Sequence, residues 1–160
     1  MIGRLFRLLR PAPKAPPRQP EDPRVAADPW LSKLFAQLGD RYRLGADGPD
    51  GTQVLRRTAR TRFNPMLVWL RPSERLVVGD YQVRAHGDRG PGDARSLLDS
   101  RITPALRQLG LDSSTESVEE WGGQLLTRRY TGRYDEPRHA AAAIRFMCQE
   151  SDQIIDTAAE

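Results

Sequence analysis

Residues that could bind a metal or act as nucleophiles are few in this chain. Its 160 residues include one cysteine, Cys148, and two histidines, His86 and His139. These residues do not have the spacing of a zinc site. On a helix, His139 and Cys148 would lie half a turn apart, so they would not form a catalytic pair. We therefore expect no metal, no cofactor and no catalytic residue, and we predict that the chain is not an enzyme.

Motifs for phosphate binding and hydrolysis are missing from the sequence as well. It contains no Walker A loop, no G-x-G-x-x-G fingerprint and no G-x-S-x-G nucleophile turn. Asp80 alternates with Gln82 and Arg84 along a predicted strand, but a metal-dependent nuclease needs more than one carboxylate there. A second acidic group, containing Glu116, Glu119 and Glu120, is interpreted as a solvated acidic rim.

Arginines with aromatic neighbours form the main candidate binding pattern. One cluster holds Arg56, Arg57, Arg60 and Arg62, and the other holds Arg128, Arg129, Tyr130 and Arg133. If the two strands that carry them are neighbours, their outward side chains form a basic sheet face. Arginine can neutralise phosphates and tyrosine can stack on bases, so such a face could bind nucleic acid. The alternative is a solvated sheet face whose arginines pair with the acidic helices.

Charge is distributed unevenly along the chain, which has a formal net charge of +4 and a sequence pI of about 9.7. Residues 1–24 hold six basic and two acidic residues, whereas residues 90–160 hold eight basic and twelve acidic residues. This asymmetry favours an electrostatic partner for the first half, either nucleic acid, an anionic membrane surface or an acidic protein. Pairing between the two halves of the folded chain is the alternative.

The first ten residues have the pattern of a basic amphipathic helix. Its apolar face would contain Ile2, Leu5, Phe6 and Leu9, and its remaining surface would contain Arg4, Arg7 and Arg10. Such a helix can dock in a partner's groove or on an anionic membrane. Six prolines between residues 11 and 24 predict an extended, semi-rigid linker without helix. We therefore divide the chain into an arm, residues 1–27, and a single domain, residues 28–160.

Hydrophobic periodicity predicts three helices and about five strands in that domain. The helices are expected at 29–38, 93–109 and 137–158, with Pro104 interrupting the second. Strands are expected at 41–44, 52–63, 66–70 and 75–85, with a bulge near Gly79, and one or two more within 118–134. The polar residues 111–117 are expected to form a loop.

Hairpin-connected strands with segregated helices indicate an α+β fold: a mostly antiparallel sheet of about five strands with three helices packed on it, preceded by a disordered, proline-rich arm. The order of elements is similar to that of type III secretion chaperones and their YbjN-like relatives. This resemblance implies a similar fold, and fold alone does not establish function. Because no run of about 18 apolar residues occurs, we expect a cytoplasmic protein that the arm could hold at a membrane surface.

These observations favour a non-enzymatic, protein-binding adaptor or chaperone-like module. Its arm would dock on a partner or on an anionic membrane surface. The second hypothesis is a nucleic-acid-binding protein that uses the arginine clusters. The third is an enzyme whose residues are assembled only by the fold. Oligomeric state and partner identity are not encoded in any motif of the sequence.

Overall fold

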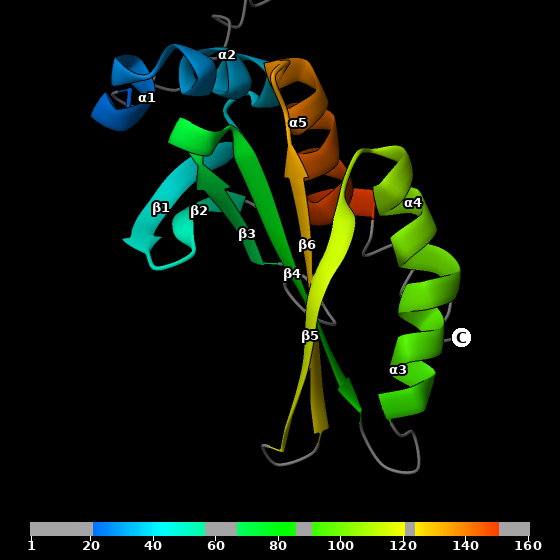
Figure 1. The fold of residues 1–160 in the computed structure, drawn as a ribbon. Coiled ribbons are helices and arrows are strands. Elements are labelled where there is room, and N and C mark those ends of the chain that lie inside the picture. Colours follow the sequence, from blue (N-terminus) through cyan, green and yellow to red (C-terminus); the bar gives the residue numbers. More distant parts are fainter. Residues whose placement is uncertain (1–20, 57–66, 86–90, 121–123, 151–160) are drawn as a thin grey trace, which may run out of the picture.

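A computed structural model describes residues 21–56, 67–85, 91–120 and 124–150 of the chain. Within them, a six-stranded antiparallel sheet has the order β1-β2-β3-β4-β6-β5 (Figure 1). The strands are β1 (Tyr42–Gly48), β2 (Gly51–Arg56), β3 (Leu67–Arg71), β4 (Leu76–Ala85), β5 (Asp112–Glu120) and β6 (Gln124–Arg133). The α+β class and the antiparallel sheet are confirmed, with six strands rather than about five.

Four helices, rather than three, accompany the sheet in the described residues. They are α1 (Pro23–Ala27), α2 (Pro29–Leu38), a continuous run from α3 to α4 and a run that begins with α5. The third comprises α3 (Pro91–Leu97), the π-helical turn η2 (Leu98–Ile102) and α4 (Thr103–Gln108). The fourth comprises α5 (Pro137–Arg145) and the π-helical turn η3 (Phe146–Glu150). Figure 1 shows α2 across one end of the sheet and α3–α4 alongside β5.

Helix α2 begins where its sequence predicts. The carboxylate of Asp28 accepts hydrogen bonds from the backbone N–H groups of Trp30 and Leu31, at 2.8 and 2.9 Å. Pro29 suits the first helical position, because a backbone N–H there would have no acceptor within the helix. Its predicted apolar face is buried at Trp30, Leu31, Leu34 and Leu38. The indole N–H of Trp30 also donates to the carbonyl of Tyr134, at 2.9 Å in the interior. This bond fixes α2 to the end of β6.

Proline interrupts the third helix, as predicted, but the interruption takes the form of a π-helical turn. Pro104 has no backbone N–H and so cannot continue the ordinary hydrogen-bond pattern. The preceding residue, Thr103, donates its N–H to the carbonyl of Leu98, five residues back. The predicted apolar stripe survives this change of pitch, because Leu98, Ile102 and Leu106 are fully buried. The helix begins at Pro91, two residues before the predicted start at Asp93.

One face of the sheet joins these helices in the core. The fully buried sheet residues include Leu70 and Val77, with Tyr130 on β6, and the helices contribute Leu34, Leu98 and Ile144. The predicted stripe of the last helix is confirmed at Ala140, Ala143, Ile144 and Met147. Residues alternate across β6, so Arg129 lies on the opposite face from Tyr130. The core therefore determines which arginine of β6 meets the helices.

Two predictions about the sheet are wrong. Residues 112–117 belong to β5 rather than to a loop, because pairing with β6 makes them an exposed edge strand. The register of β4 runs without a shift through Gly79, so the predicted bulge is not there. Register shifts occur instead between Leu44 and Asp47 in β1 and between Ser113 and Thr115 in β5.

The predicted linker ends earlier than expected, because Pro23 and Arg24 belong to α1. Pro23 takes the first turn of this helix, where its missing N–H costs no hydrogen bond. Val25 is buried in the core. The guanidinium of Arg24 donates to the carbonyl of Gly45 at 2.9 Å and to Asp47 at 3.1 Å. The arm helix at 1–10, most of the linker, and the predicted segments 57–63 and 151–158 lie outside the described residues.

Candidate functional site

Two consecutive arginines of β6 point to opposite faces of the sheet, and each is held by two carboxylates. Arg128 lies opposite Tyr81 of β4 and Glu116 of β5, whereas Arg129 lies opposite Asp80 of β4. Arg128 faces the helix α3–α4, and Arg129 faces away from it. Each arginine therefore belongs to a separate network.

Arg128 is the centre of the network on the helix side. Its Nε and Nη2 donate to Oε2 of Glu116 at 2.9 and 2.7 Å, and its Nη1 donates to Asp99 of η2. The other oxygen of Glu116 accepts from Nε of Arg95 at 2.6 Å. Arg128 is 8% exposed. The chain of charges Arg95–Glu116–Arg128–Asp99 thus connects β5 and β6 to the long helix.

These contacts favour the charged forms of Glu116 and Arg128. The hydrogen bond from Arg95 holds the pKa of the Glu116 carboxyl below its usual value, and Arg128 acts in the same direction against the opposing effect of burial. Burial lowers the pKa of Arg128, but the hydrogen bonds to Asp99 and Glu116 outweigh it, so that the pKa is raised overall. A carboxylate held ionised and an arginine held protonated are poor proton-transfer groups. The network is suited to positioning rather than to acid–base catalysis.

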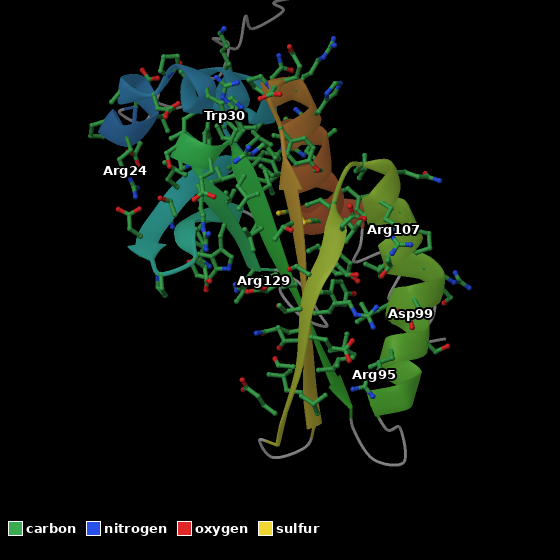
Figure 2. All side chains as sticks on the ribbon, in the orientation of Figure 1. Arg24, Trp30, Arg95, Asp99, Arg107 and Arg129 are labelled. Atoms are coloured by element: carbon green, nitrogen blue, oxygen red, sulfur yellow. The ribbon has the colours of Figure 1, made fainter. Side chains whose placement is uncertain are left out.

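A polar cleft of about 480 Å³ lies between the helix and β5, directly over this network. Its lining is Asp99, Thr103, Arg107, Ser113, Ser114, Thr115, Glu116 and Arg128. The side chains of Asp99 and Arg107 are 65% and 63% exposed, so both charges meet solvent at the cleft. Figure 2 shows Arg95, Asp99 and Arg107 spaced along the same helix. The cleft therefore offers hydroxyl groups and charges of both signs to a ligand.

The network on the opposite face joins the β1–β2 turn to the middle of the sheet. Nε and Nη2 of Arg129 donate to the two oxygens of Asp80, each at 2.6 Å, and Nη1 donates to Asp50 at 2.8 Å. The bond from Arg129 lowers the pKa of the Asp50 carboxyl. Asp80 is 7% exposed, so its charge is compensated almost entirely by Arg129.

The expected basic sheet face does not form in the described part of the chain. The strand β2, which carries Arg56, is separated from β6 by β3 and β4. Tyr130 is buried and shares a hydrogen bond of 2.9 Å with Thr103, so it cannot stack on a base. Arg133 is exposed at the end of β6. The alternative interpretation, pairing with the acidic helices, is confirmed only for Arg128 and Asp99. The other partner of Arg128 and both partners of Arg129 lie in strands or in the β1–β2 turn.

The remaining members of the predicted sites lie outside the structural description. The side chain of Arg56 is not described, and Arg57, Arg60 and Arg62 fall between β2 and β3 in residues 57–66. The arm residues Ile2, Arg4, Leu5, Phe6, Arg7, Leu9 and Arg10 fall in residues 1–20. His86 also falls outside, whereas His139 is exposed on α5 and Cys148 is partly buried.

Groups of metal ligands and long apolar helices are both missing from the described residues. Within 21–56, 67–85, 91–120 and 124–150, no three His, Cys, Asp or Glu side chains are grouped in a way that could hold a metal ion. No helix in these ranges is long and apolar enough to cross a membrane.

Sequence reasoning missed the cleft because its two walls are distant in the chain. Asp99 and Arg107 come from the helix, whereas Ser113, Ser114 and Thr115 come from a segment expected to be a loop. One sequence signal could have indicated it: Glu116 and Arg128 have opposite charges, which favour a cross-strand pair. It becomes visible only once residues 112–120 are recognised as a strand.

Comparison of the chain with protein-family models, with curated proteins and with solved structures found no match. The element order that resembles type III secretion chaperones therefore stays an expectation about fold. Function has to be inferred from the cleft, the edge strand and the charges around them.

Proposed function

We propose that this chain is a non-enzymatic, protein-binding adaptor or chaperone-like module that binds its partner at the surface formed by η2, α4 and β5. The observation that carries the proposal is the polar cleft, which lies beside a strand at the edge of the sheet. Its exposed carboxylate, Asp99, and the exposed hydroxyl groups of Ser113 and Thr115 can form hydrogen bonds with a partner. Glu116 and Arg128 beneath them are already bound to each other, which favours recognition over proton transfer.

The arm provides a second contact in this proposal. A basic amphipathic segment has apolar residues to bury and cations to place against an anionic surface. The proline-rich residues that follow would hold it at a distance from the domain. The arm would therefore dock on a partner or on an anionic membrane while the cleft binds a protein.

The nucleic-acid alternative gains no support from the described residues. To bind phosphates, Arg128 and Arg129 would each have to break ion pairs with two carboxylates. This is unfavourable, because carboxylates that are partly buried would be left without a cation. The alternative then depends on the exposed Arg133 and on the predicted cluster Arg56, Arg57, Arg60 and Arg62.

A cross-linking experiment on the full-length chain tests the proposal. A photoreactive amino acid would replace Arg107 at the cleft or, as a control, Asp40, which is exposed ahead of β1 at the other edge of the sheet. In cells of the source organism, we expect a nuclease-resistant protein cross-link from position 107 and none from position 40. Ser114→Arg, which fills the cleft from an exposed position, should abolish that cross-link in the chain labelled at position 107. Equal cross-linking from both positions, or none from position 107, would refute the proposal.

A further inference from the structure

We infer that the partner supplies an extended, cationic polypeptide segment that adds a strand to the outer edge of β5. This inference rests on the proposed function, because it specifies the partner class of the same surface. It is carried by three features of the described residues: an exposed edge, an excess of carboxylates along it, and the cleft beside it.

The edge strand is long and accessible. β5 is the last strand in the sheet order and contains nine residues. Every residue from Asp112 to Glu119 is exposed, although the side chain of Glu116 is only 27% exposed. Figure 1 shows β5 in front of β6, with the helix α3–α4 to its right. An edge strand of this kind presents a row of unpaired N–H and C=O groups, to which an extended peptide can bind.

The charge of β5 selects the kind of peptide. The strand contains Asp112, Glu116, Glu119 and Glu120 and has no basic residue. Glu116 forms ion pairs with Arg95 and Arg128. Oδ1 of Asp112 lies 3.5 Å from Nε of Arg107, whose side chain is largely exposed. Glu119 has no ion pair within the described residues. Since opposite charges across neighbouring strands are favourable and like charges are unfavourable, lysine or arginine is preferred opposite Glu119.

The cleft gives one side of an added strand a place for its side chains. Residues of β5 alternate in direction, so Ser113, Glu116 and Val118 share the side that faces the helix. A basic residue of the added strand on this side would reach the exposed carboxylate of Asp99. Val118 is a large hydrophobic residue that is 40% exposed, and it favours an apolar neighbour on the added strand. The expected segment is therefore cationic with an occasional apolar residue.

Three other occupants fit this edge less well. A second copy would bring its own acidic β5 against the first, placing like charges close together. The arm of the same chain is cationic, but its residues 1–10 are expected to form a helix rather than a strand, and residues 11–20 contain Pro11, Pro13, Pro16, Pro17 and Pro20. Each proline lacks the N–H that a paired strand requires. The acidic edge also repels a nucleic-acid backbone.

The test uses a labelled synthetic peptide in which arginine alternates with threonine and valine, added to the full-length chain. Binding should slow hydrogen exchange of β5 amides. The amides of an added strand point alternately toward β5 and away from it. In one control peptide the first set of alternate amides is N-methylated, and in the other control peptide the second set is. The peptide whose methylated amides face β5 should lose binding, because it lacks those hydrogen-bond donors. Glu119→Lys should weaken binding of the parent peptide about tenfold. Asp40→Lys makes the same change of charge at the other edge and should leave binding within about twofold.

The outcomes separate this inference from the proposed function. Equal binding of the parent peptide and both N-methylated peptides would refute strand addition, and so would equal binding by the Glu119→Lys and Asp40→Lys variants. Tighter peptide binding after removal of residues 1–20 would identify the arm as the occupant and overturn the inference. A partner that cross-links at position 107 without slowing exchange in β5 would refute strand addition while the proposed function stands. If no protein cross-links at position 107, the proposed function itself fails.

Discussion

Arg128 and Arg129 are neighbours in the sequence, yet they stabilise different parts of the molecule. Arg128 binds Glu116 and Asp99 beneath the long helix, whereas Arg129 binds Asp80 and Asp50 on the other face. Each guanidinium donates through three nitrogens to two carboxylates, which the single ammonium group of lysine could not reproduce. Single substitutions can therefore distinguish the contribution of each network.

Replacing Arg128 should be costly because it leaves Glu116 partly buried with one cation fewer. We expect Arg128→Gln to lower the free energy of unfolding by about 2–3 kcal/mol. Urea denaturation at neutral pH would measure this change. The matched control is Arg133→Gln, an exposed arginine of the same strand, which should change the stability by less than about 0.5 kcal/mol. Similar effects of the two substitutions would show that the buried network adds nothing specific.

Acidification should weaken the same network through Glu116. Arg95 and Arg128 lower the pKa of Glu116 in the folded protein. The contribution of Glu116 to the free energy of unfolding is therefore present above its unfolded pKa of about 4.3, and it is lost as the pH falls through the folded pKa. We expect Glu116→Gln to destabilise the protein at pH 7 by about 1–2 kcal/mol. The difference between the two proteins should shrink steadily below about pH 4.3.

Urea unfolding of both proteins from pH 7 to pH 3 would measure that difference. Asp22 and Asp50 also have lowered pKa values, through Arg24 and Arg129 respectively, but both proteins contain them and their effects cancel. A difference that stays constant over this range would contradict the assigned role of Glu116.

At the scale of elements, sequence patterns predicted those segments that bury a regular apolar face. α2 and β3 are of this kind: the first has apolar residues at helical spacing, and the second is a continuous apolar run from Leu67 to Leu70. β5 could not be predicted in this way because its exposed side chains have no apolar alternation. Its strand conformation depends on pairing with β6, which is a contact between distant residues. The same dependence explains why the cleft was missed.

The approach of α4 to β6 requires a glycine at position 132. A Cβ atom there would lie 2.6 Å from the carbonyl oxygen of Gly110, which follows α4, and 3.0 Å from the ring of Tyr134. Because a backbone atom cannot move aside cheaply, we expect Gly132→Ala to lower the free energy of unfolding by about 2 kcal/mol. In Gly48→Ala the nearest atom is 3.7 Å away, so that control should cost less than about 0.5 kcal/mol. Thermal and urea unfolding of both variants would decide the point, and equal stabilities would exclude close packing at Gly132.

At the scale of the whole molecule, the boundary of the domain follows from contacts that local patterns do not reveal. Proline content predicted an extended linker up to residue 24, but Arg24 reaches Gly45 and Asp47 in β1. Val25 adds an apolar side chain to the core. These tertiary contacts make α1 part of the domain, although a five-residue helix would not be stable alone.

Two deletions separate the role of α1 from that of the arm. Removing residues 1–20 takes away a proline-rich, cationic segment and should change the free energy of unfolding by less than about 0.5 kcal/mol. Removing residues 1–28 also takes away Val25, the contacts of Arg24 and the Asp28 cap of α2. That longer deletion should cost at least about 2 kcal/mol.

Sedimentation with anionic phospholipid vesicles then tests what the arm does, since the shorter deletion is expected to leave the domain folded. If the arm docks on such a surface, the full-length chain should sediment with the vesicles and the chain lacking residues 1–20 should not. Leu5→Ser with Phe6→Ser removes apolar area and keeps every cation, so it should also lose binding if the apolar face inserts. Binding that survives this double substitution but disappears in high salt would indicate a purely electrostatic arm, because exposed charges are screened within about 10 Å at 0.1 M salt.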